Sequence, residues 1–158
     1  MEDALRLASR DDCRVVHFTV QDNHLHLIVE AQGRAALSRG LQGLAIRCAR
    51  AINRALGRRG RVWAERYHAR ALRTPREVRR GLVYVLQNWR KAVTGADRLD
   101  PQSSARWFDG WRGPRPAWSL PFPEEVAVVR PARTWLVTTG WKRLGLIGFT
   151  ERPRGSLD

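Results

Sequence analysis

The alternation of apolar and polar side chains changes its period along the chain, and each change marks an expected element. Residues 1–12 have a short amphipathic pattern that is typical of the last turns of a helix. The β-branched run RVVHFTV at 14–20 and the run HLHLIVE at 24–30 flank the polar break QDN, which predicts a β-hairpin. From Gly33 to Gly57 apolar residues recur at steps of three and four, which predicts one long helix.

The clearest boundary in the sequence is the start of a second helix at Thr74. Thr74 is suited to be the N-cap, Pro75 to take the first helical position and Glu77 to complete a capping box. This helix is expected to end near residue 93. The residues on its expected apolar face are Val78, Leu82, Val85 and Trp89.

Two further segments complete the expected organisation. Residues 62–73 alternate loosely and are expected to form a strand, whereas residues 94–158 hold most of the tryptophans and prolines. We therefore expect a core at 1–93 and a C-terminal extension at 94–158, with 134–149 suited to pack against the core. The order of elements predicts an α+β fold, with helices on one face of an antiparallel sheet.

The charge is the outlier in the composition. The 158 residues include 29 Lys and Arg against 15 Asp and Glu, which gives a net charge of +14. A domain this basic usually binds a polyanion, and aromatic rings among the basic residues favour single-stranded or hairpin DNA. The side chains we expect to contact DNA are Arg47, Arg50, Arg54, Arg58, Arg59, Arg61, Arg66, Arg70 and Lys91.

Cysteine usage and hydropathy limit the compartment. Cys13 and Cys48 form no C-x-x-C motif, which argues against a disulfide framework or a cysteine metal site and fits a reducing compartment. The N-terminus lacks the apolar core of a signal peptide, and no run approaches the ~18 apolar residues of a membrane helix. We expect a cytoplasmic, nucleoid-associated protein that does not enter a membrane.

Two histidines are the first candidates for chemistry. On a strand, His24 and His26 share a face, and their imidazoles can converge on one metal ion at ~2.0–2.1 Å from each. The alternative is that the H-x-H pattern arises here by coincidence, without a metal. Its position in a hairpin of a very basic chain argues against that alternative. Two other phosphate chemistries fit less well. Ile28 stands where histidine-triad hydrolases need a third histidine, and the two-histidine phosphoesterases need a second H-x-[ST] motif beside the one at 17–19.

Tyr84 is the candidate nucleophile. It lies about 120° from Val78, the centre of the apolar face, and Asn88 follows one turn later on nearly the same line. The alternative is an amphipathic tyrosine at the rim of the core. A phenol, with a pKa of about 10, attacks a phosphate poorly at neutral pH without a base or a metal ion. A histidine pair on the sheet and a tyrosine on the facing helix meet that requirement.

The ordered set of motifs resembles the HUH single-tyrosine transposases, especially the REP-associated tyrosine transposases of bacteria, which are insertion-sequence-200-like. VVHFTVQDNHLHLIVEA is similar to their N-H-x-H-L-hydrophobic-V signature. The long helix, the string ERYHARAL and the helix ending YVLQNWRKA follow in the family's order. The family's Tyr-x-x-x-Asn pattern falls on Tyr84 and Asn88, and the resemblance covers about residues 13–93.

The resemblance implies a fold, a site and partners. The fold would be ferredoxin-like. His24 and His26 would bind Mg²⁺ or Mn²⁺, with Asn88 as a third polar ligand or a group behind the ligands. Tyr84 would cut one DNA strand, stay bonded to the 5′ phosphate and release a 3′ hydroxyl. Family members recognise DNA hairpins and usually act as homodimers. Tyr67 matches a common aromatic of the preceding strand, which gives it a structural or DNA-contacting role.

The chain departs from the family in two places, and two alternatives stay open. Family members normally begin with a strand and a full helix, so either the true start lies upstream or a strand of the sheet is missing. Trp89 replaces the proline that usually follows the asparagine.

One alternative function is that of a hairpin-binding protein that no longer cuts DNA. The other is a rolling-circle replication protein or relaxase, although those chains are typically longer and often have two neighbouring tyrosines.

Overall fold

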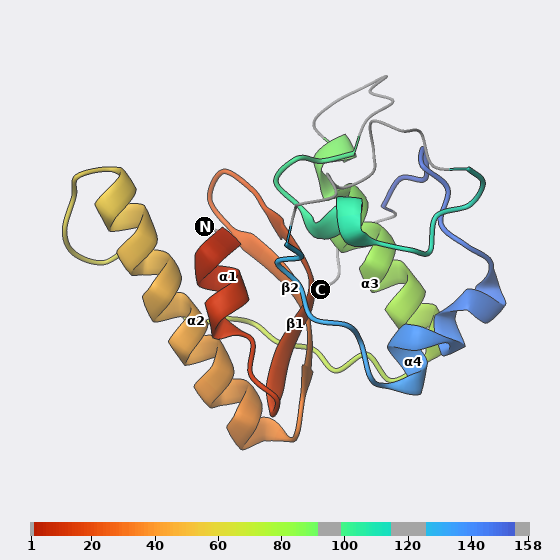
Figure 1. The fold of residues 1–158 in the computed structure, drawn as a ribbon, viewed down its shortest axis with the longest axis horizontal. Helices are drawn as coiled ribbons and strands as arrows, with labels where there is room; N and C mark the ends of the chain where they lie inside the picture. Colours follow the sequence, from red (N-terminus) through yellow and green to blue (C-terminus); the bar gives the residue numbers. More distant parts are fainter. Residues whose placement is uncertain (1, 92–98, 115–125, 154–158) are drawn as a thin grey trace.

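The fold is α+β, as predicted, and is built around one antiparallel β-hairpin (Figure 1). The computed structural model describes residues 2–91, 99–114 and 126–153. The hairpin consists of β1 (Cys13–Val20) and β2 (Leu25–Ala31). The longer helices are α1 (Glu2–Ala8), α2 (Arg34–Ala55) and α3 (Pro75–Gln87). The shorter helical segments are η1 (Asn88–Lys91), η2 (Ser104–Trp107), α4 (Trp135–Thr138) and η4 (Gly140–Leu144).

The register of the hairpin separates two apolar cores. Phe18 pairs with Leu27, and a bulge between Val15 and His17 shifts the pairing once along β1. Because successive residues of a strand point to opposite faces, Phe18 packs with α1 and α2, whereas Ile28 packs with α3. Each core therefore uses one face of the same two strands.

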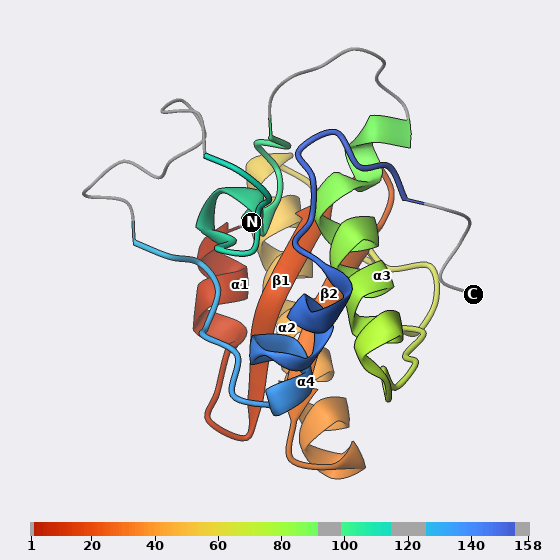
Figure 2. The same ribbon diagram turned by 90° about the vertical axis from the view of Figure 1, so that its right-hand side faces the viewer.

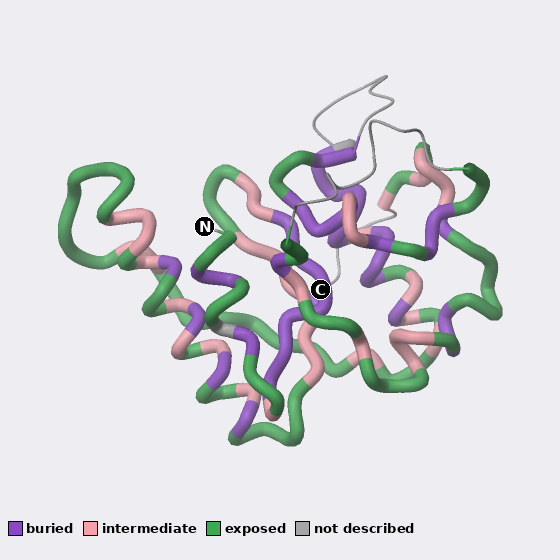
Figure 3. Tube along the Cα trace, viewed as in Figure 1, coloured by how far each residue is buried: buried purple, intermediate pink, exposed green. Residues whose placement is uncertain are grey.

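Helices cover both faces of the hairpin, which differs from the single face expected from the sequence. α1 and α2 lie on one side, and α3, α4 and η4 lie on the other (Figures 1 and 2). The reason is the burial of β1, which is continuous from Cys13 to Thr19 and thus includes side chains of both faces (Figure 3). A strand buried in this way needs a layer on each side. The ferredoxin-like arrangement stays a prediction.

The prediction of a strand at 62–73 is wrong, because this segment contains neither helix nor strand. A strand needs a neighbour that pairs with its backbone groups, and the segment pairs with neither β1 nor β2. Side chains attach it instead. Trp63 packs against the core that α2 helps to form, and Leu72 packs against the core that α3 helps to form. Most of the residues between these two are exposed (Figure 3).

The α3 helix begins as predicted. The Thr74 hydroxyl accepts a hydrogen bond from the Glu77 amide at 3.2 Å, and the Glu77 carboxylate accepts one from the Thr74 amide at 3.0 Å. The capping box therefore satisfies donors at the helix start in both directions. The predicted apolar face is buried at Val78, Leu82, Val85 and Trp89. The helix ends at Gln87 and tightens into η1, and residue 93, its expected end, lies outside the described residues.

The long predicted helix corresponds to α2, which packs closely on β1. A β-carbon added at Gly40 would lie 2.3 Å from Sγ of Cys13, so only glycine permits this approach. The thiols of Cys13 and Cys48 are both free and buried. In the part of the chain that the structure describes, no helix has the length and apolar character needed to cross a membrane.

The C-terminal extension lies along the edge of β1 that β2 does not occupy. The carbonyl of Gln102 accepts a hydrogen bond from the Val20 amide at 2.9 Å, and the carbonyl of Val15 accepts one from the Arg130 amide at 2.9 Å. These bonds satisfy backbone groups that an open strand edge would leave exposed. The boundary between a core at 1–93 and an extension at 94–158 stays a prediction.

The extension also packs against α3. The predicted packing segment 134–149 buries Trp141 and Ile147 in the core beside this helix. Arg79 of α3 forms a two-pronged ion pair with Glu151, with distances of 2.6 and 2.9 Å, and donates to two backbone carbonyls nearby. The Arg79 guanidinium lowers the pKa of the Glu151 carboxyl. The extension therefore contacts both the hairpin and α3.

Candidate active site

His24, His26 and Tyr84 form a row of three rings, which we call the histidine–tyrosine cluster. The ring centre of His26 lies 4.6 Å from that of His24 and 4.9 Å from that of Tyr84. Both contacts are edge to face, with interplanar angles of 76° and 81°. The structure thus brings together the two histidines and the tyrosine that the sequence singled out.

The cluster forms because α3 packs on the face of the hairpin that carries His26. His24 closes the turn that precedes β2, His26 is a residue of β2, and Tyr84 is a residue of α3. His24 is exposed, whereas His26 and Tyr84 are half-buried. Tyr84 also packs against the apolar core, so its burial alone suits a tyrosine at the rim of the core. Its contact with His26 is the observation that favours a chemical role.

Asn23 orients the first histidine. Its side-chain oxygen is hydrogen-bonded to Nδ1 of His24. An amide oxygen only accepts, so Nδ1 donates this hydrogen bond, and in the neutral ring Nε2 is then the nitrogen that can bind a metal ion. A hydrogen bond on one ring nitrogen commonly fixes the other as a metal ligand. Asn23 is the first residue of the N-H-x-H-L signature, but nothing in the sequence indicated its bond to His24, because the string QDN predicted only a turn.

The spacing of the two imidazole rings is compatible with a shared metal ion. Two imidazoles that share an ion at ~2.0–2.1 Å from each nitrogen have ring centres roughly 5 Å apart, close to the 4.6 Å between His24 and His26. The described residues contain no group of three or more His, Cys, Asp or Glu side chains that could hold a metal. Any further protein ligand from these residues is therefore an amide, a hydroxyl or a backbone oxygen.

Asn88 supplies a second observation that fits a metal or a substrate. Its side chain is buried, with 7% exposed, and lies one turn beyond Tyr84. Its Oδ1 has no hydrogen-bond partner among the described residues. A buried amide oxygen without a partner is costly, and ligation of an ion or contact with a bound group would offset that cost.

A second feature is a surface rich in arginine. The arginines predicted to contact DNA are all exposed on α2 and the following loop, namely Arg47, Arg50, Arg54, Arg58, Arg59, Arg61, Arg66 and Arg70. We call them the arginine surface. Some guanidinium groups bind the loop itself, because Arg58 donates to the carbonyl of Arg61, and Arg61 donates to that of Trp63. The side chain of Lys91, the ninth predicted contact, lies outside what the structure describes.

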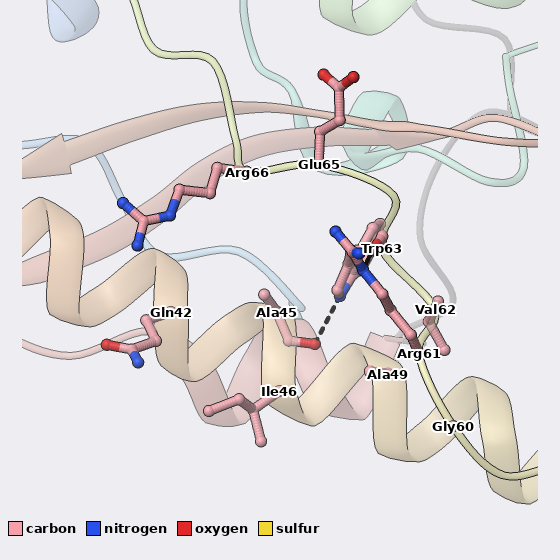
Figure 4. A pocket seen from close by; sticks show the side chains of 10 residues that line it. All are labelled: Gln42, Ala45, Ile46, Ala49, Gly60, Arg61, Val62, Trp63, Glu65 and Arg66. Carbon is pink, nitrogen blue, oxygen red and sulfur yellow. Dashed lines mark hydrogen bonds between the residues drawn. The ribbon is translucent and has the colours of Figure 1, made fainter.

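A shallow groove adjoins the arginine surface. It has a volume of about 390 Å³ and lies between α2 and the loop at 60–66 (Figure 4). The indole N–H of Trp63 donates to the carbonyl of Ala45 at 2.8 Å, which attaches the loop to the helix (Figure 4). Ile46 contributes an exposed apolar side chain to the lining. Tyr67 lies just beyond this loop and is 48% exposed.

His17 has an environment unlike that of the paired histidines. It is buried in β1, its Nδ1 is hydrogen-bonded to the hydroxyl of Ser104 at 3.1 Å, and its ring meets Phe108 edge to face. Burial lowers the pKa of His17 to about 4. In the sequence, His17 stood out only as part of one H-x-[ST] motif. No local signal indicated that a serine so distant in the sequence would bind it.

Comparison with protein families identifies the class and then the family. Residues 4–84 match the family described as transposase, IS200 like, and the match covers about half of the chain. The protein is therefore a transposase, a class of protein that binds and cleaves DNA in transposition and recombination. The chain belongs to the IS200-like family of transposases. Searches of curated proteins and of solved structures found no match.

Proposed function

We propose that this transposase cleaves and rejoins single-stranded DNA through a covalent bond between Tyr84 and a 5′ phosphate. The contact between His26 and Tyr84, with ring centres 4.9 Å apart, is the observation that carries the proposal. It puts the candidate nucleophile beside the candidate metal site. The family match supports transposition in general, and the contact supports this particular chemistry.

The step exchanges one ester bond for another. The phenol oxygen of Tyr84 loses its proton to solvent and bonds to phosphorus, while the bond from phosphorus to the 3′ oxygen breaks. The departing 3′ oxygen takes up a proton and becomes a free hydroxyl. Because the number of phosphate esters does not change, attack by a 3′ hydroxyl on the phosphotyrosine rejoins a strand without an external energy source.

His24 and His26 would hold the divalent ion, with Asn88 as a third ligand or a group behind the ligands. When bound, Mg²⁺ or Mn²⁺ polarises the phosphate and makes it more susceptible to attack. Imidazole nitrogen suits Mn²⁺ better than Mg²⁺, which prefers oxygen ligands. The hydrogen bond from His24 to Asn23 holds the ring with its other nitrogen available.

The arginine surface would bind the DNA backbone. Its eight guanidinium groups are exposed on one helix and one loop, and guanidinium forms paired hydrogen bonds with phosphate. The preferred substrate would be a DNA hairpin and the active form a homodimer, as the resemblance to REP-associated transposases implies. A DNA-binding protein of this kind would lie in the cytoplasm, associated with the nucleoid.

The test is strand cleavage of labelled hairpin DNA with a single-stranded flank, in the presence of Mn²⁺. We expect the parent protein to nick the flank and Tyr84→Phe to bind the same DNA without nicking it. Tight binding by the parent without cleavage would instead support the alternative, a transposase derivative that recognises hairpins but no longer cuts.

A further inference from the structure

Three side chains link the C-terminal extension to the turn of the hairpin. The side-chain Nε2 of Gln21 donates to the Thr19 hydroxyl at 2.9 Å, and this hydroxyl donates to Oδ2 of Asp100 at 2.8 Å. Thr19 and Asp100 are both buried, with 0% and 5% exposed. We call these three residues the turn brace. It joins residues that are far apart in the sequence but adjacent in the fold.

The turn brace lies next to both members of the histidine pair. Thr19 is directly opposite His26 in the register of the hairpin. Residues in that relation point to the same face, with β-carbons about 4.5–5.5 Å apart. The backbone N–H of Gln21, at the other end of the brace, donates to the carbonyl of His24 at 2.9 Å. One histidine therefore lies opposite the middle of the brace, and the other is bonded to the backbone of the residue at its outer end.

Asp100 is held rigidly on the side of the extension. Its Oδ1 accepts a hydrogen bond from the Gln102 amide at 2.9 Å, and its carbonyl accepts one from the Ser103 hydroxyl at 3.0 Å. Burial raises the pKa of the Asp100 carboxyl, and the bonds from Gln102 and Thr19 act in the opposite direction. The buried carboxylate therefore depends on these two donors, and loss of either leaves an acceptor without its partner.

We propose that Thr19 and Asp100 are positioning residues of the metal site, which hold the hairpin turn so that His24 and His26 face one ion. The inference rests on the proposed function, because it concerns the metal site proposed there. A two-stranded hairpin is marginally stable by itself, so the geometry of its turn depends on what the turn contacts. Residues 99–104 of the extension thereby contribute to the site without touching the ion.

The test measures the dissociation constant of Mn²⁺ alone for the full chain by calorimetry. Thr19→Val replaces the hydroxyl with a methyl group of similar size, and we expect it to weaken binding about 10-fold, as for groups that orient metal ligands. Thr19→Ser keeps the hydroxyl and should bind within about 2-fold of the parent. Gln21→Ala removes the side-chain bond to Thr19 and leaves the backbone bond to His24 in place, so it tests the brace even if Thr19→Val folds poorly.

The matched control is Ser9→Ala. Ser9 accepts a hydrogen bond from the Val15 amide at 3.0 Å, at the end of β1 away from the histidines. Its loss should lower the melting temperature as Thr19→Val does but leave the Mn²⁺ affinity unchanged. Unchanged affinity in both Thr19→Val and Gln21→Ala, or an equal loss in Ser9→Ala, would overturn the inference alone. A parent protein that binds no Mn²⁺ would overturn the metal site itself and this inference with it.

Discussion

The imidazole of His26 meets the ring of Tyr84 edge to face, with 4.9 Å between the ring centres. Since His26 belongs to β2 and Tyr84 to α3, this contact exists only when the hairpin and the helix are packed together. The C-terminal extension contacts both of these elements. The extension is thus part of the structure that keeps the candidate nucleophile beside the candidate metal ligands.

The histidine pair should account for metal binding. We expect His24→Ala and His26→Ala each to weaken Mn²⁺ binding at least about 100-fold, because a single imidazole remains. Calorimetric titration of the purified protein measures the affinity. His68→Ala is the control, since that histidine is exposed and its ring nitrogen lies 3.8 Å from the carboxylate of Glu65. An equal loss in His68→Ala would place the metal elsewhere.

His17 should make stability depend on pH. An unfolded histidine takes up a proton below about pH 6.5, but burial lowers the pKa of His17 to about 4. The free energy of unfolding should therefore fall as the pH drops from about 6.5 towards 4, by up to about 3 kcal/mol from this group. His17→Asn keeps an amide near the Ser104 hydroxyl and does not titrate.

Urea unfolding at pH 7 and pH 4.5 measures this effect. The parent should lose more stability over the interval than His17→Asn does. Equal losses in the two proteins would mean that His17 becomes protonated in the folded state.

The elements with local signals were predictable from the sequence. Thr74, Pro75 and Glu77 define the start of α3 through a capping box, and the two runs on either side of QDN define the hairpin. Local patterns did not reveal how the extension packs. Thr19 binds Asp100 and His17 binds Ser104 through side chains more than 80 residues apart in the sequence, and such pairs leave no periodic pattern.

The same reasoning explains the two differences from expectation. The loose alternation of 62–73 suggested a strand, but a strand exists only with a neighbour, and this segment pairs with neither strand of the hairpin. The burial of β1 on both faces reflects the extension and α3, which cover the face that α1 and α2 leave free. For the candidate site, the sequence indicated His24, His26 and Tyr84, whereas the contacts that Asn23 and Thr19 make emerged only from the hydrogen bonds.

The ion pair between Arg79 and Glu151 should stabilise the fold. Both side chains are mostly buried, with 17% and 30% exposed. In a double-mutant cycle with Arg79→Gln and Glu151→Gln, we expect a coupling of about 1–3 kcal/mol from urea unfolding. The exposed pair of Arg6 and Asp3 is the control and should show under about 1 kcal/mol. Similar couplings for the two pairs would contradict the role of Arg79.

The arginine surface should determine how DNA binding depends on salt. Arg50→Gln and Arg54→Gln should each weaken binding to hairpin DNA and reduce the slope of log affinity against log salt by about 1, as expected for lost phosphate contacts. Fluorescence anisotropy measures the slope between roughly 50 and 200 mM salt, a range over which binding to phosphates changes strongly. Arg6→Gln removes an arginine of α1 that is already paired with Asp3 at 3.0 Å, and it should leave the slope unchanged. A reduced slope in that control would place the DNA elsewhere.

Covalent capture tests the central claim most directly. The protein would be incubated with Mn²⁺ and labelled single-stranded hairpin DNA from the sequences that flank its own gene, and resolved on a denaturing gel beside Tyr84→Phe, His26→Ala and Tyr67→Phe. We predict a DNA–protein adduct in the parent and in Tyr67→Phe, and none in Tyr84→Phe or His26→Ala. An adduct that persists in Tyr84→Phe, or a parent that binds this DNA tightly and forms no adduct, would contradict the assignment of Tyr84 as the nucleophile.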